Sequence, residues 1–106
     1  MIKVFVYGGF TTNGRYHQYC LQGKTFLGKG YLEGYKKYIL GGLHGILPEN
    51  GERVQGEVYE IDAAALARLE FIQNYGNKFT RRMVDVEMEN GEHIPAEAYI
   101  WDGAVS

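Results

Sequence analysis

Apolar residues recur along the chain in short runs separated by glycines, a pattern typical of β-strands rather than of long helices. Between two of the later runs, Asn90-Gly91 is a strong signal for a tight hairpin. The stretch 45–51, which contains Pro48, is predicted to be a loop. The predicted strands cover residues 4–7, 26–32, 35–40, 54–61, 82–88 and 94–101.

One long helix is predicted from residue 63 to about residue 74. Asp62 stands at its N-cap position, three alanines fill its first turn, and Gly76 follows its end. A shorter helix is predicted over 16–22, with Gly23 as the residue that ends it. The chain therefore combines a majority of strands with two helices.

The longer helix carries polar residues close to its apolar stripe of Leu66, Leu69 and Ile72. At about 100° per residue, Gln73 falls between Leu66 and Leu69 on the helical wheel. Glu70 lies only about 40° from the same line. A buried polar side chain without hydrogen-bond partners costs about 1–3 kcal/mol, so the two residues predict a polar pocket near the helix end. The alternative is a frayed last turn that exposes both to water.

The first apolar run, 4–7, stops at two glycines, Gly8 and Gly9. Because glycine has no Cβ, the backbone N–H groups at this point can approach a small anionic group. The pair therefore predicts a receptor for a carboxylate. A tight turn without a binding role is the alternative.

Length and charge limit the classes of function. The 106 residues fit one domain, and 11 basic against 13 acidic side chains give a formal charge of -2. Because nucleic-acid binding usually needs a basic excess, we expect no nucleic-acid partner. No apolar run is long enough to span a bilayer, and the chain enters a strand at once instead of a signal peptide. We therefore expect a cytoplasmic location and no membrane partner.

Other reactive residues form weaker constellations. His17 and Cys20 stand three apart in the short predicted helix and could touch as a nucleophile pair, although an inert buried cysteine is the commoner case. Cys20 is the single cysteine, so it forms no disulfide within the chain. The spacing of His17, His44 and His93 is not that of metal ligands, and we expect no metal. Glu57 and Glu60 fall on opposite faces of one strand, so at most one faces a pocket.

Several segments resemble one known family in order and spacing over essentially the whole chain. They are 4–10, His17, 27–28, 56–62, 66–69, 79–81 and 98–101. The resemblance is to the gamma-glutamylcyclotransferase-like family, which includes AIG2-like and YtfP-like proteins. It implies an α+β fold, a small mixed β-barrel flanked by two helices, as a single domain over 1–106. Tyr99 and Trp101 of the last strand either close that barrel or pair two copies, so a homodimer is possible.

The resemblance also implies a chemistry that needs no cofactor. Enzymes of the family close a γ-glutamyl group on itself, which gives 5-oxoproline and releases an amine or amino acid. The substrate's α-amine attacks its own γ-carbonyl, so a general base must take a proton and return one to the leaving nitrogen. Backbone amides of the glycine loop can hold the α-carboxylate or the developing oxyanion. The substrate-binding positions implied are Tyr7, Gly8, Gly9, Phe10, His17, Glu57 and Phe79.

The chain departs from the family at the catalytic position. The family's glutamate falls on Gln73, and the preceding acidic position falls on Glu70. A carboxamide does not accept a proton at useful pH, so Gln73 can bind but not act as the base. Either the substitution is natural divergence or a deliberate change, or Glu70 supplies the base, or the alignment around 74–78 is shifted.

Other positions depart as well. Gly9 and Phe10 stand where a small polar residue and leucine are usual, and Phe79 replaces a tyrosine and so lacks its hydroxyl. Two functions stay open. The first is cyclisation of a γ-glutamyl amine or amide, and the second is non-catalytic binding or sequestering of a small molecule in the same pocket.

Overall fold

The computed structural model describes residues 1–40, 43–73 and 79–102. Strands dominate the described chain, as the sequence pattern predicts. The elements are β1 (Ile2–Val6), the 3-10 turn η1 (Gly8–Phe10), α1 (His17–Cys20), β2 (Thr25–Leu40), β3 (Leu43–Ile61), α2 (Ala63–Gln73), β4 (Phe79–Met88) and β5 (His93–Trp101).

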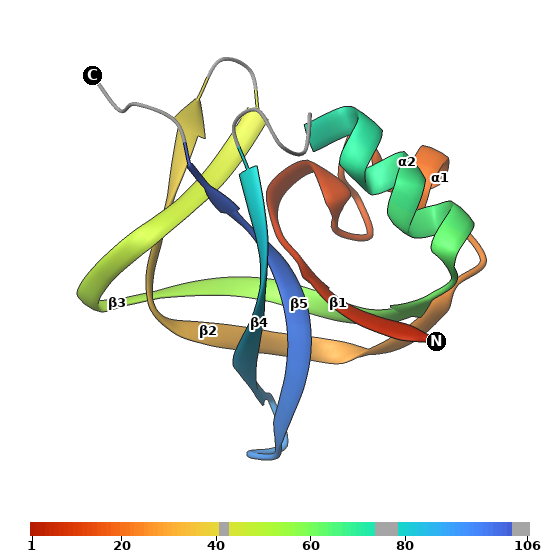
Figure 1. Cartoon of the computed structure of the whole chain (residues 1–106). Helices are drawn as coiled ribbons and strands as arrows, with labels where there is room; N and C mark the ends of the chain where they lie inside the picture. The colour runs from red at the N-terminus through yellow and green to blue at the C-terminus, as the bar shows by residue number, and fades with distance from the viewer. Residues whose placement is uncertain (41–42, 74–78, 103–106) are drawn as a thin grey trace.

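The strands close into a barrel in the order β1-β3-β2-β4-β5. β1 and β5 are parallel, with Val4 opposite Glu97, and the neighbouring pairs β1–β3, β2–β3, β2–β4 and β4–β5 are antiparallel. Figure 1 shows α1 and α2 together on one side of the barrel, next to η1. The expected small mixed barrel with two flanking helices is confirmed.

The long β2–β3 hairpin corrects the strand prediction. β2 is one strand where two were expected, and β3 continues through the stretch 45–51 that was predicted to be a loop. Pro48 pairs with Tyr35, and pairing resumes at Glu33 with Arg53, so the turn-forming residues make a bulge inside a continuous ladder. Glycine and proline mark this irregularity correctly, but they do not interrupt the strand because pairing holds it on both sides.

Both helices form where they were expected. α2 begins after Asp62, whose Oδ1 accepts a hydrogen bond from the backbone N–H of Ala65 at 2.9 Å, so the predicted N-cap is confirmed. α1 is shorter than predicted, and Gly23, with φ of 79°, lies between it and β2. Gly76 lies outside the described residues.

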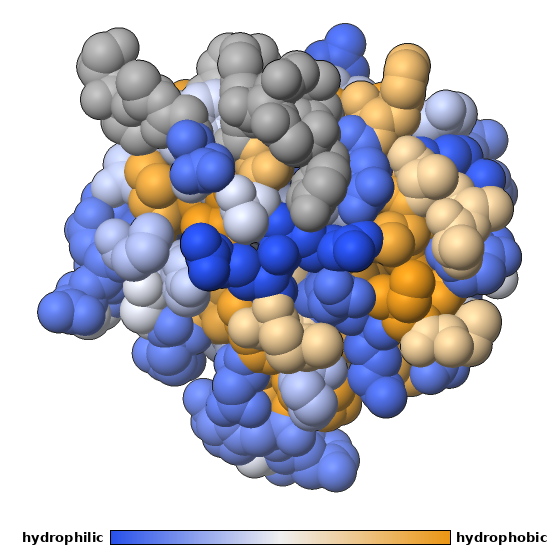
Figure 2. All heavy atoms as spheres, viewed as in Figure 1, coloured by the Kyte–Doolittle hydropathy of each residue, from blue (hydrophilic) through white to orange (hydrophobic). Residues whose placement is uncertain are grey.

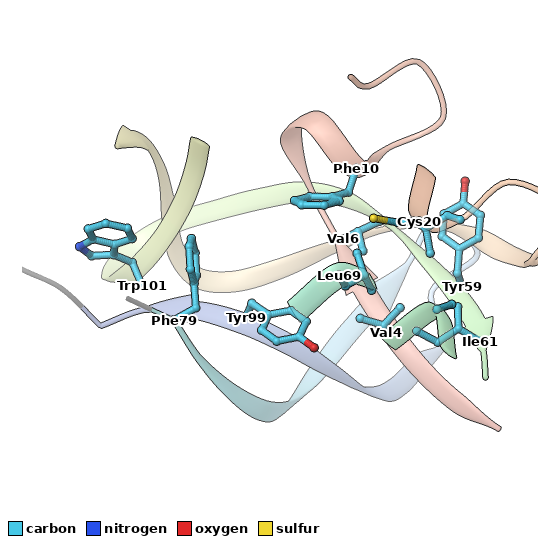
Figure 3. Close-up of a cluster of buried hydrophobic side chains, with 12 residues drawn as sticks. Val4, Val6, Phe10, Cys20, Tyr59, Ile61, Leu69, Phe79, Tyr99 and Trp101 are labelled. Carbon is cyan, nitrogen blue, oxygen red and sulfur yellow. The ribbon is translucent and has the colours of Figure 1, made fainter. Parts of the chain in front are cut away.

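Two buried clusters divide the core. One fills the barrel and consists of strand residues, such as Phe5, together with Tyr7, which directly follows β1. The other combines residues of the strands with residues of η1, α1 and α2, and Figure 3 shows their side chains. Alternate residues of β1 point to opposite sides, so Phe5 enters the first cluster and Val4 and Val6 the second. The second cluster contains Val4, Val6, Phe10, Cys20, Leu21, Tyr59, Ile61, Ala65, Leu69, Phe79, Tyr99 and Trp101.

The last strand belongs to this core. Tyr99 and Trp101 are buried within the single chain, at 1% and 9% exposure. Their rings therefore pack inside one chain, where β5 closes the barrel. No helix in the described part of the chain is long and apolar enough to cross a membrane.

Candidate functional site

The glycine loop, which begins at Gly8 shortly after β1, is anchored by the preceding residue, Tyr7. The Tyr7 side chain is buried, and its hydroxyl donates a hydrogen bond to the backbone oxygen of Tyr99 at 2.6 Å. Burial raises the pKa of the Tyr7 phenol well above its ordinary value, so it remains a donor. The contact connects the start of the glycine loop to β5, the parallel neighbour of β1 in the barrel.

Gly8 has a conformation and a neighbour that require glycine. Its φ is 62°, and a Cβ added there would lie 2.4 Å from Nδ1 of His44. The His44 imidazole therefore packs directly against the backbone of the loop. Burial and then the Lys37 ammonium lower the pKa of His44, which favours its neutral form.

An open hollow of about 280 Å³ lies beside this loop. It combines glycine backbone with charged and polar side chains from β2 and β3. The lining residues are Gly8, Thr11, Lys29, Lys37, Gln55, Gly56 and Glu57. The structure thus brings Gly8 and Glu57 together, two of the predicted substrate-binding residues.

Glu57 is the buried acid of this hollow, with 7% of its surface exposed. Its Oε1 accepts hydrogen bonds from the backbone N–H of Thr12 at 2.8 Å and from the Tyr59 hydroxyl at 3.0 Å. The Thr12 hydroxyl lies within 3.1 Å of both carboxylate oxygens. Four short contacts fix the orientation of this carboxylate beside Gly8.

Gln73 is buried at the last turn of α2, with 2% of its surface exposed. The inward orientation predicted from the helical wheel is confirmed, and the frayed turn is wrong for this residue. Its Oε1 has no hydrogen-bond partner among the residues that the structure describes. One turn earlier, Leu69 packs in the same buried cluster as Phe10 of the glycine loop. Gln73 is not among the residues that line the hollow.

Glu70 is engaged in a charged network. Its Oε2 lies 2.8 Å from Nη1 of Arg81 and accepts a hydrogen bond from the Tyr99 hydroxyl at 3.1 Å. Nε of Arg81 lies 2.9 Å from Oε1 of Glu97. Burial, and then the charge of Glu70, raise the pKa of the Tyr99 phenol. Figure 2 shows a band of strongly hydrophilic residues across this face, over β4 and β5.

The remaining predicted positions lie in the packed interior or beside it. Nδ1 of His17 lies 3.3 Å from the backbone oxygen of Phe10. Phe79 is buried and packs edge-on against Trp101, with ring centroids 5.3 Å apart. Gly9 is half-buried and precedes Phe10 in η1.

Cys20 has the properties of an inert thiol. It is buried, and burial raises its pKa to about 11 although the charge of Arg68 acts in the opposite direction. A thiolate nucleophile paired with His17 is therefore not supported. Among the described residues, no group of three or more histidine, cysteine or acidic side chains could hold a metal ion.

Sequence reasoning missed the basic residues of the hollow, Lys29 and Lys37, and it missed His44. Lys29 faces Glu57 across the β2–β3 ladder, and His44 reaches Gly8 from the far end of β3. Each contact depends on strand register over a long separation in sequence. No local pattern in the sequence carries that information.

Comparison with known proteins gives the family. The family model described as gamma-glutamyl cyclotransferase, AIG2-like, matches residues 4–106. A gamma-glutamylcyclotransferase family protein of Citrobacter rodentium, YtfP, is 34% identical over 83 residues, which cover 78% of this chain and 71% of that protein. A gamma-glutamylaminecyclotransferase of Bos taurus is 33% identical over 114 residues, covering 98% of this chain and 67% of the relative.

A solved structure gives the same answer for the fold. The crystal structure of an AIG2-like protein from Mus musculus superposes with a TM-score of 0.83 at 26% sequence identity. The alignment covers 94% of this chain and 76% of the mouse chain. Sequence match and barrel topology agree, and the chain belongs to the gamma-glutamyl cyclotransferase, AIG2-like family.

Proposed function

We propose that the chain binds the γ-glutamyl group of a small amide or amine conjugate beside Gly8 and cyclises it slowly to 5-oxoproline. The observation that carries this proposal is the buried carboxamide of Gln73, with an unpartnered oxygen, at the position that the family resemblance gives to the catalytic glutamate. A carboxamide does not accept a proton, so the chain lacks a general base at this position.

The hollow supplies the groups that such a substrate needs. Gly8 lines the hollow although the His44 ring fills the side where another residue would carry a Cβ, so we place an anionic oxygen against its backbone from the hollow side. The fixed carboxylate of Glu57 attracts the substrate's α-ammonium group. A backbone dipole at Gly8 and a carboxylate at Glu57 thus line the same hollow, which suits the carboxylate and the ammonium group of the α-amino acid part of a γ-glutamyl conjugate.

The reaction balances within the substrate. The α-ammonium group loses one proton, its nitrogen forms a bond to the γ-carbon while the carbonyl oxygen takes the electron pair, and the nitrogen then loses a second proton. The bond to the leaving nitrogen then breaks as that nitrogen takes up protons, which leaves 5-oxoproline and an amine. A base that relays these protons is worth about 10²–10⁴ in rate, and Gln73 supplies no such base. Slow turnover follows.

Non-catalytic binding in the same hollow is the second candidate. The observation that favours it is the state of Glu70, whose carboxylate is paired with Arg81 and Tyr99 instead of standing free. With Glu70 engaged and a carboxamide at Gln73, the end of α2 offers no free carboxylate among its described residues. The chain would then hold or sequester a small metabolite.

One experiment separates the two candidates. Release of 5-oxoproline from a panel of γ-glutamyl amines and γ-glutamyl amino acids is measured for the wild type, Gln73→Glu and Gln73→Leu, and calorimetry gives the affinity of each. We expect slow turnover by the wild type and a gain of about 10²-fold or more for Gln73→Glu. Gln73→Leu should show no gain over the wild type.

The outcomes are distinct. Binding without 5-oxoproline from any variant supports the binding protein and contradicts cyclisation. Failure of every γ-glutamyl compound to bind a folded wild-type chain contradicts cyclisation and leaves only the binding of another small molecule.

A further inference from the structure

The hollow beside Gly8 has two lysines that neither proposed function uses. Lys29 and Lys37 come from one strand, β2, and both line the same hollow because β2 curves around the barrel. Lys29 lies opposite Glu57 in the β2–β3 ladder, so their side chains leave the same face of the sheet. Lys37 lies further along β2, beyond the irregularity between Glu33 and Tyr35.

The charged residues of this hollow differ in their partners: Glu57 is buried and hydrogen-bonded, whereas Lys29 and Lys37 are exposed to solvent. Glu57 already accepts hydrogen bonds from Thr12 and Tyr59. Neither Lys29 nor Lys37 forms an ion pair within 4.0 Å with any acid that the structure describes. A ligand that seats its ammonium group against Glu57 therefore still meets two unpaired ammonium groups on the protein.

The surroundings reinforce the positive field. The Lys37 ammonium contributes to lowering the pKa of His44, so its charge is felt at the loop itself. The volume of about 280 Å³ is close to the lower end of the range of small-ligand sites, about 300–1,000 Å³. A ligand that fills the hollow lies within a few ångströms of both lysines, well inside the screening length of about 8 Å at physiological salt.

We infer that Lys29 and Lys37 select conjugates whose leaving half carries carboxylate groups, an inference that rests on the proposed binding of the γ-glutamyl group beside Gly8. A leaving group with an acidic side chain offers one carboxylate to each lysine. A simple alkylamine offers none. The lysines are specificity-determining residues, and they take no part in the proton transfer.

Calorimetry with three probes tests this inference. The probes are γ-glutamylglutamate, γ-glutamylglycine and γ-glutamyl ethylamide, whose leaving halves carry two, one and no carboxylates. The variants are Lys29→Gln, Lys37→Gln and the double variant. Lys36→Gln is the matched control, because Lys36 is an exposed neighbour on β2 that does not line the hollow.

We expect the wild type to bind the three probes in the order of their carboxylates. Each lysine substitution should weaken γ-glutamylglutamate about twofold to fivefold, and the double variant should bind all three probes alike. Lys36→Gln should behave as the wild type. Raising salt from about 0.05 M to about 1 M should weaken γ-glutamylglutamate more than the ethylamide in the wild type.

Different contrary results would overturn either the lysine inference or the proposed function. Equal binding of all three probes by the wild type, or losses in Lys29→Gln and Lys37→Gln no larger than in Lys36→Gln, overturns the lysine inference and leaves the proposed function intact. Failure of all three probes to bind overturns the proposed function itself. A wild-type salt dependence that is no larger for γ-glutamylglutamate than for the ethylamide also overturns the lysine inference.

Discussion

At the scale of single residues, the glycine loop depends on one close approach. Gly8 combines a left-handed backbone with the His44 ring at the place where a Cβ would stand. Gly51 has a similar positive φ of 84°, but a Cβ there would meet nothing within 4 Å. Comparing substitutions at Gly8 and Gly51 therefore separates the free-energy cost of the left-handed backbone from that of the clash with the His44 ring.

Gly8→Ala should therefore destabilise the chain more than Gly51→Ala. The left-handed conformation costs about 1–2 kcal/mol at either site. The contact with His44 should add about 1–3 kcal/mol at Gly8. Urea denaturation measures the difference, and His44→Ala in the Gly8→Ala background should recover part of the loss. Equal losses at the two glycines would contradict the close packing of His44.

His44 and His93 should titrate on opposite sides of the ordinary histidine pKa of about 6.5. Burial and Lys37 lower the pKa of His44, whereas Asp85 raises the pKa of His93. NMR titration of the ring protons should give the two directions. Lys37→Gln should raise the pKa of His44, and Asp85→Asn should lower that of His93.

The sign of the His44 shift also fixes its effect on stability. Its folded pKa is lower than its unfolded value, so the unfolded chain binds the proton more readily. The contribution of His44 to the free energy of unfolding is fully present above about pH 6.5, and it is lost as the pH falls through the lower folded pKa. In the wild type the urea midpoint should fall between about pH 8 and about pH 5, and this fall should be smaller in His44→Gln. An unchanged loss would show that His44 is not shifted.

At the scale of elements, α2 is joined to the barrel by a charged network as well as by its apolar stripe. Arg81 of β4 contacts Glu70 of α2 and Glu97 of β5. Tyr99 of β5 adds a hydrogen bond to Glu70. The network holds the end of the helix, and thus Gln73, against the two strands.

We expect Glu70→Gln to lower stability without affecting the chemistry. Loss of the ion pair with Arg81 should cost about 1–2 kcal/mol of the free energy of unfolding, because the pair is only half-buried. Glu33→Gln, which removes the exposed pair with Arg53 at 3.9 Å, should cost less than about 0.5 kcal/mol. Denaturation and 5-oxoproline assays on both variants check this. If folded Glu70→Gln loses all turnover that the wild type has, Glu70 is the base.

At the scale of the whole molecule, local patterns in the sequence predict the parts of the fold that depend on local physics. The Asp62 cap and the helical period place α2 and turn Gln73 inward, as observed. The continuity of β3 through Pro48 was missed, because it depends on pairing with the distant Tyr35. Tertiary pairing prevails there over the local preference for a turn.

The site is predictable to the same extent. Gly8 and Glu57 were expected from sequence and family resemblance, and they do line one hollow. Lys29 and Lys37 line the hollow, and His44 contacts Gly8, through the curvature and register of β2 and β3, which no short segment encodes. Residues that reach a barrel hollow through strand register are thus harder to find from the sequence than those of a local motif such as the glycine pair.

The central claim is that a γ-glutamyl compound binds beside the glycine loop. Nitrogen–proton correlation NMR during titration with γ-glutamylglycine tests it most directly. We predict that the backbone amides of Gly8, Gly9 and Thr12 shift in a saturable way, while that of Gly91, in the β4–β5 hairpin, stays in place. Saturable shifts confined to other parts of the barrel, with the amides of Gly8 and Gly9 unmoved, would contradict the account.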